Sequence, residues 1–152
     1  MSFRRLILML VCVIFLVGFD KPPEFLLYDL NDKFVSLYQS KGKVVVLYFW
    51  ADWCCKDRAL LADEDFYKKY KEKGLVILAI NSGQPKKVVE KFTRERNLPY
   101  LVLLDLRFSA TKQYGVTALP MIFVLDREGT IRNRVLGQVE FAYLEKVLDP
   151  LL

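Results

Sequence analysis

Two adjacent cysteines are the residues of this sequence best able to carry covalent chemistry. Cys54 and Cys55 follow Trp53, and Lys56 and Asp57 come next. A cysteine where a strand leads into a helix lies near unpaired backbone N–H groups, which favour the nucleophilic thiolate. Lys56 would strengthen this effect, whereas the carboxylate of Asp57 would raise the thiol pKa. Cys54 is therefore the candidate nucleophile, and a structural or relic cysteine is the alternative.

The second thiol allows two further interpretations. Consecutive Cα atoms lie about 3.8 Å apart across a trans peptide, below the range of about 4.4–6.8 Å that is usual for bridged cysteines. A Cys54–Cys55 disulfide would be strained and easily reduced, which suits a redox switch better than a structural bridge. Two thiolates could instead hold a soft metal such as Cu(I). The chain has no histidine and no nearby methionine motif, so we expect no metal site and no cofactor.

The elements that must position the cysteines follow from hydrophobic patterning. Residues 44–50 are rich in β-branched and aromatic types and predict a buried strand, and a helix is expected from about residue 59 to 73. Further along, we expect a buried strand at 75–81, a helix ending near 97, an edge-type strand at 100–105, a short helix at 108–114, a hairpin of 121–125 with 131–136, and a closing helix at 141–148. An N-terminal hairpin is expected at 25–30 and 34–37, laid beside the main sheet. The pattern predicts an α/β fold, a central mixed sheet with helices on both faces.

Several motifs together resemble the thioredoxin superfamily, and most closely its membrane-anchored extracytoplasmic TlpA/ResA/CcmG branch. The resemblance covers about residues 24–148. It is carried by the segments 25–33, 42–46, 49–54, 114–123 and 126–129. It implies a thioredoxin-like fold and a thiol–disulfide oxidoreductase that acts on cysteine-bearing extracytoplasmic proteins, in disulfide reduction or cytochrome c maturation.

The cysteine motif departs from the pattern of that family. Its members carry Cys-x-x-Cys after the tryptophan, whereas here Asp57 occupies the resolving position and Cys55 comes one place too early. The acids that assist proton transfer in relatives are also replaced, by Tyr48 and by Leu60. Cys54 would therefore act as the single matched cysteine, and its mixed disulfide would be released by an external thiol or by Cys55. Turnover should be slow.

The same resemblance implies a peptide-binding surface. It places a cis peptide bond before Pro120, opposite the attacking cysteine, and assigns Leu119 and Pro120 to the binding of an extended peptide; an ordinary trans turn before a strand is the alternative. Trp50 and Trp53, close to Cys54 in the sequence, can shield the sulfur and offer a flat surface to the same peptide. These residues do not need a resolving cysteine, so a redox-inactive binding module tethered to the membrane is the alternative function. A peroxiredoxin function is a third and weaker alternative, because the Pro-x-x-x-Thr-x-x-Cys site of that family is absent from the sequence.

The N-terminus reads as a leader followed by one folded domain. Arg4 and Arg5 precede an apolar run at 6–19, which is typical of a signal peptide or an uncleaved anchor with the domain outside the cytoplasm. We therefore expect residues 1–23 to be leader and linker, and 24–152 to form the thioredoxin-like domain. The net charge is +5, but the basic residues are spread over expected helix faces and no nucleic-acid-binding motif accompanies them. We therefore expect no nucleic-acid partner. The oligomeric state stays open.

Overall fold

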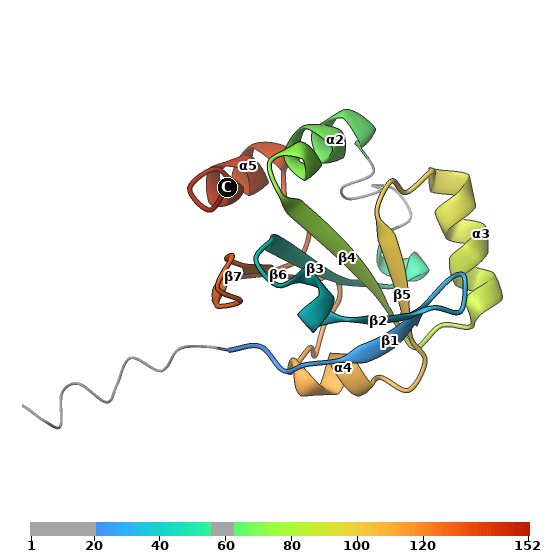
Figure 1. The fold of residues 1–152 in the computed structure, drawn as a ribbon. Coiled ribbons are helices and arrows are strands. Elements are labelled where there is room, and N and C mark those ends of the chain that lie inside the picture. The colour runs from blue at the N-terminus through green and yellow to red at the C-terminus, as the bar shows by residue number, and fades with distance from the viewer. Residues whose placement is uncertain (1–20, 56–62) are drawn as a thin grey trace, which may run out of the picture.

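The computed structural model of the protein describes residues 21–55 and 63–152. The described residues form a seven-stranded sheet of order β2-β1-β5-β4-β3-β6-β7 (Figure 1). Strands β3, β4 and β5 are parallel, and the other neighbours pair antiparallel. The strands are β1 (Leu26–Asp29), β2 (Phe34–Ser36), β3 (Val44–Trp50), β4 (Leu75–Ser82), β5 (Leu101–Asp105), β6 (Met121–Leu125) and β7 (Ile131–Leu136).

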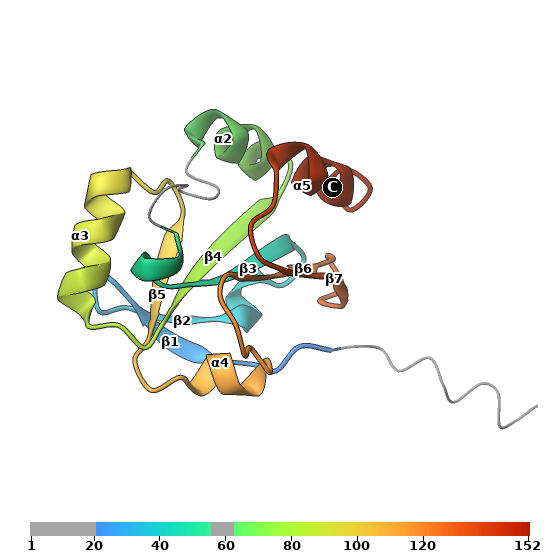
Figure 2. The same cartoon turned by 180° about the vertical axis from the view of Figure 1, so that it is seen from behind.

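Helices cover both faces of this sheet. Figures 1 and 2 show α2, α3 and α5 on one side and the short α4 on the other. Their bounds are α2 (Glu64–Glu72), α3 (Lys86–Arg96), α4 (Ser109–Gln113) and α5 (Phe141–Leu148), with the 3-10 helices η2 (Leu37–Ser40) and η3 (Asp52–Cys54). The expected α/β architecture, a central mixed sheet with helices on both faces, is confirmed.

Strand β3 is the centre of the core, because all seven of its residues are buried. Successive side chains of a strand point to opposite faces. Val44, Val46, Tyr48 and Trp50 therefore pack under α2, α3 and α5, whereas Val45, Leu47 and Phe49 pack on the α4 side. A strand buried on both faces needs apolar residues throughout, and this explains the continuous run that marks it in the sequence.

Two expectations about the elements, the position of β5 and the start of α2, are wrong in detail. β5 is an interior strand between β1 and β4 rather than an edge strand. The expected N-terminal hairpin is confirmed, because β1 and β2 pair antiparallel, and it extends the main sheet because Tyr28 and Asp29 pair with β5. Helix α2 begins at Glu64 and not near residue 59, because Asp63 is its N-cap and accepts a 2.8 Å hydrogen bond from the N–H of Phe66.

The leader expected at 1–19 lies outside the described residues. No helix within 21–55 or 63–152 is both long enough and apolar enough to cross a membrane.

Candidate active site

The two cysteines lie in the loop that leaves the carboxyl end of β3. Cys54 is the last residue of η3 and Cys55 follows it. Cys54 is half-buried, and its Sγ lies 3.4 Å from the backbone nitrogen of Ala51 and 3.1 Å from the carbonyl oxygen of the same residue. Cys55 is only 2% exposed and packs in the core under α2 and α3. One thiol is therefore open to a partner, and the other is inside the protein.

The sulfur atoms of the two residues lie 2.8 Å apart, and both cysteines are free thiols. They are in direct contact because the chain bends between η3 and Cys55, and no movement of another element is needed to bring them together. A thiolate on one of the two cysteines would therefore be within reach of the sulfur of the other. The arrangement would let one thiolate attack a mixed disulfide on the other sulfur, so that a Cys54–Cys55 bridge forms as the mixed disulfide breaks.

A buried tyrosine contacts the inner thiol. The hydroxyl of Tyr48 lies 3.0 Å from Cys55 Sγ, and Tyr48 is 3% exposed. Burial raises the pKa of Cys55 to about 12, with its hydrogen bond to Cys54 adding to the rise and the hydrogen bond from Tyr48 opposing it. Burial also raises the pKa of Tyr48 far above its ordinary value, and the pKa of Tyr100 is raised by burial and then by the nearby Cys55 charge. Both phenols therefore stay protonated.

A side-chain network fixes the start of the cysteine loop. Gln84 accepts from the backbone N–H of Asp52 at 2.8 Å and donates to the Asp52 carboxylate at 2.6 Å. Asn81, at the end of β4 and 1% exposed, donates to the same Gln84 oxygen at 2.9 Å. Because Asp52 begins η3, this network links the position of Cys54 to the end of the neighbouring strand.

The cis peptide bond lies at the same end of the sheet. Leu119–Pro120 is cis, as the family resemblance implied. Phe49 pairs with Met121 across β3 and β6, so Pro120 lies beside the end of β3 that leads to Cys54. Pro120 is buried and its carbonyl accepts from Gly137 N at 2.9 Å, while Leu119 is half-buried.

The two tryptophans have opposite environments. Trp53 is 62% exposed, next to Cys54, where it can offer a flat apolar surface. Trp50 is 1% exposed and packs against Phe92 of α3 with ring centroids 4.8 Å apart. The expectation that Trp50 contributes to a peptide-binding surface is therefore wrong: its place on the strand turns the indole under α3.

Lys56 and Asp57 lie outside the described residues, as does Leu60. The N-terminus of α2 is at Glu64, so Cys54 does not lie at the start of that helix. The Sγ of Cys54 instead contacts the backbone of Ala51, the N-cap of η3.

Within 21–55 and 63–152, no cluster of three or more potential metal ligands occurs, and the absence of a metal site stays a prediction.

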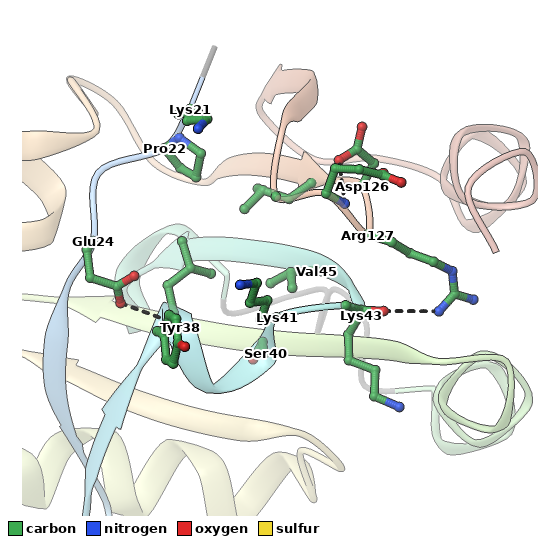
Figure 3. A pocket seen from close by; sticks show the side chains of 15 residues that line it. Lys21, Pro22, Glu24, Tyr38, Ser40, Lys41, Lys43, Val45, Asp126 and Arg127 are labelled. Atoms are coloured by element: carbon green, nitrogen blue, oxygen red, sulfur yellow. Dashed lines mark hydrogen bonds between the residues drawn. The ribbon is translucent and has the colours of Figure 1, made fainter. Parts of the chain in front are cut away.

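A cavity of about 340 Å³ opens at the other end of β3 (Figure 3). It is lined by residues of the N-terminal segment, by the start of β3 and by the β6–β7 turn. Arg127 donates to the carbonyls of Gly42 and Lys73, and Glu24 accepts from the N–H of Tyr38. No thiol lines this cavity, and it is separated from the cysteines by the length of β3.

Sequence reasoning missed the contacts of Tyr48 and Gln84. The family resemblance marks Tyr48 only as the replacement of an acid, although the alternation along β3 places it on the same face as Trp50. No local pattern indicates that Gln84 reaches Asp52, because the two residues are 32 positions apart in the chain. In the structure, Tyr48 contacts Cys55 and Gln84 forms hydrogen bonds with Asp52, so both side chains contact the cysteine loop.

Comparisons with known proteins agree with this architecture. The model of the AhpC/TSA family matches residues 19–134. The chain is 34% identical over 128 residues to the thiol-disulfide oxidoreductase ResA of Bacillus thuringiensis subsp. konkukian (strain 97-27), covering 83% of this chain and 73% of the relative. The chain therefore belongs to the AhpC/TSA family of thioredoxin-like proteins.

Solved structures show the same fold. A Chlorobium tepidum protein provisionally named thiol:disulfide interchange protein DsbE is 29% identical, with a TM-score of 0.78 over 88% of this chain and 96% of that one. StoA from Bacillus subtilis is 26% identical, with a TM-score of 0.69 over 82% of this chain and 96% of that one.

Proposed function

We propose that the protein is a thiol–disulfide oxidoreductase in which Cys54 alone attacks the substrate disulfide and Cys55 then releases the substrate from Cys54. The observation that carries this proposal is the 2.8 Å contact between the half-buried and the buried sulfur. The relatives named thiol-disulfide oxidoreductase ResA support the reaction class.

The first step uses the accessible sulfur. Cys54 loses its proton to solvent, and its thiolate attacks one sulfur of a substrate disulfide. A Cys54–substrate disulfide forms, and the other substrate sulfur leaves as a thiolate. Cys55 cannot take this role, because it is 2% exposed.

The second step uses the buried sulfur. The Cys55 thiolate attacks Cys54 Sγ, a Cys54–Cys55 disulfide forms, and the second substrate sulfur leaves and takes up a proton. Two electrons have then moved from the cysteine pair to the substrate. Since a bridge between adjacent residues is strained, an external dithiol protein reduces it readily and restores both thiols.

The substrate is a cysteine-bearing protein outside the cytoplasm, with apocytochrome c as one class. The exposed face of Trp53 and the half-buried Leu119 beside buried Pro120 would hold an extended segment of it at this end of the sheet. The apolar run at 6–19 would tether the chain to the membrane or direct its secretion.

A redox-inactive binding module is the second candidate. The burial of Cys55 and its pKa of about 12 favour it, because a thiol that stays protonated at neutral pH attacks slowly. Trp53 and Leu119 would then bind a peptide without any exchange of bonds.

Oxidation of the full chain with glutathione disulfide distinguishes the two, in a Cys12→Ser background that leaves Cys54 and Cys55 as its only thiols. We expect the wild type to form a bridge, Cys55→Ser to keep a glutathione on Cys54, and Cys54→Ser to form neither, as read by intact mass after acid quenching. A wild-type chain with neither bridge nor adduct would leave the binding module as the function.

A further inference from the structure

The buried thiol has a hydrogen-bond partner that the reaction sequence above does not use. Tyr48 is on β3, at the centre of the core, and its hydroxyl lies 3.0 Å from Cys55 Sγ. Cys55 Sγ in turn lies 2.8 Å from Cys54 Sγ. A continuous contact therefore runs from a phenol inside the protein through the inner sulfur to the sulfur that meets the substrate.

We propose that Tyr48 is a catalytic residue of the second step, in which its hydroxyl donates a hydrogen bond to the Cys55 thiolate as that thiolate attacks Cys54 Sγ. The proposal rests on the exchange function proposed above.

The surroundings of Cys55 explain why such a donor is needed. Its sulfur is buried in a cluster that includes Trp50, Phe66 and Ile122. A thiolate taken out of water into such a cluster is costly unless a hydrogen bond stabilises its charge. The polar groups that contact or influence it are Cys54, Tyr48, Tyr100 and the backbone of Ala51.

Tyr48 can serve only as a donor and not as a general base. Burial raises its pKa far above the ordinary value, so the phenol is protonated whenever Cys55 ionises. The proton that Cys55 loses goes to the substrate sulfur that leaves Cys54, directly or through solvent. Tyr48 keeps its own proton throughout, so the step balances as a mixed disulfide and a thiol giving the Cys54–Cys55 disulfide and a free substrate thiol.

The test is Tyr48→Phe, which removes the hydroxyl and keeps the ring, in the full chain carrying Cys12→Ser so that Cys54 and Cys55 are its only thiols. A glutathione is first placed on Cys54 at low pH, and its release by Cys55 is followed after a jump to each of several pH values. We expect release to slow by about 10- to 100-fold near pH 8, the usual value of a hydrogen bond to a charged group, and its pH profile to move upward. Attachment of glutathione to Cys54 should keep its wild-type rate.

The matched control is Tyr114→Phe. Tyr114 is also buried, but it packs on the α4 side of the sheet and its hydroxyl donates to the carbonyl of Pro23 at 2.7 Å. This variant should release glutathione at the wild-type rate. Unchanged release and an unchanged pH profile in Tyr48→Phe would overturn the proposal.

A second measurement separates this proposal from the proposed function. In a Cys12→Ser/Cys54→Ser background, Cys55 is the only cysteine, and carbon NMR of labelled cysteine reports its ionisation without any exchange. We expect Tyr48→Phe to raise the pH at which Cys55 ionises, and an unmoved titration would overturn the proposal even in a wild type that exchanges. If the titration moves but the wild type forms no bridge or adduct, the exchange function fails and the catalytic role of Tyr48 fails with it.

Discussion

Gln84 and Asp52 are joined by two hydrogen bonds, one to the backbone N–H of Asp52 at 2.8 Å and one to its carboxylate at 2.6 Å. Gln84 also accepts from buried Asn81. The loop that carries Cys54 is thus held to the end of β4 by one side chain, and the geometry of the site depends on a residue that has no thiol chemistry of its own.

Gln84→Ala is expected to reduce exchange. The change leaves the N–H of Asp52 and the amide of Asn81 without their partner, which costs about 1–3 kcal/mol of folding free energy. Attack by Cys54 should slow because the loop is no longer fixed. Gln84→Glu, which restores the acceptor but not the donor to Asp52, should be no better because it places two carboxylates together. The rate of glutathione attachment and urea unfolding measure both effects, and a wild-type rate in Gln84→Ala would contradict the positioning role.

The pH dependence of stability should report the burial of Cys55. Its folded-state pKa is about 12, and that of a free cysteine in the unfolded chain is about 8.5. The folded state therefore holds its proton when the unfolded state has lost it. The contribution is complete below about pH 8.5 and is lost as pH rises toward 12, at up to about 1.4 kcal/mol per pH unit.

Urea unfolding at pH 8 and pH 9.5 checks this sign. Between these two pH values, the unfolding free energy of the wild type should fall by about 1 kcal/mol more than that of Cys55→Ser. The buried tyrosines begin to titrate in the unfolded chain only near pH 10 and are shared by both proteins. Equal losses in the two proteins would show that the Cys55 thiol ionises as easily in the fold as in the open chain.

Substitution of Trp53 should affect peptide binding, whereas substitution of Trp50 should affect the stability of the fold. Trp53→Ala removes an exposed side chain and should change the unfolding free energy by less than about 0.5 kcal/mol, while weakening binding of an extended cysteine-free peptide about tenfold. Trp50→Ala empties a position in the core and should cost about 3–5 kcal/mol. Urea unfolding and calorimetric titration in a Cys54→Ser background give the two quantities. Unweakened binding in Trp53→Ala would remove it from the proposed surface.

Gly83, beside Gln84, should tolerate no side chain. Its φ is +79°, and an added Cβ would lie 1.9 Å from Cζ of Phe108. Gly129 has the same φ of +79° with nothing within 4 Å of an added Cβ, so Gly129→Ala isolates the backbone cost of about 1–2 kcal/mol. Gly83→Ala should lose more than this in thermal or urea unfolding, and adding Phe108→Ala should recover the excess only. Equal losses at the two glycines would show that the ring of Phe108 moves aside freely.

The family and most of the elements could be predicted from the sequence because they depend on local signals. A run of apolar residues at 44–50, the spacing to Cys54 and the motif around Pro120 are each read over a few neighbouring positions. The adjacency of Cys54 and Cys55 is likewise a property of the chain. These features follow from covalent geometry and from the period-two alternation of a strand.

Tertiary packing alone decided which of the two thiols is buried, which tryptophan is exposed, and which polar groups meet the cysteine loop. Trp50 and Tyr48 share a face of β3, but that face is covered by helices supplied from residues 64–148. Gln84 reaches Asp52 across 32 positions of the chain. A strand pattern gives the face of a residue, whereas the elements that pack on that face come from distant sequence, and they set the environment in which its chemistry occurs.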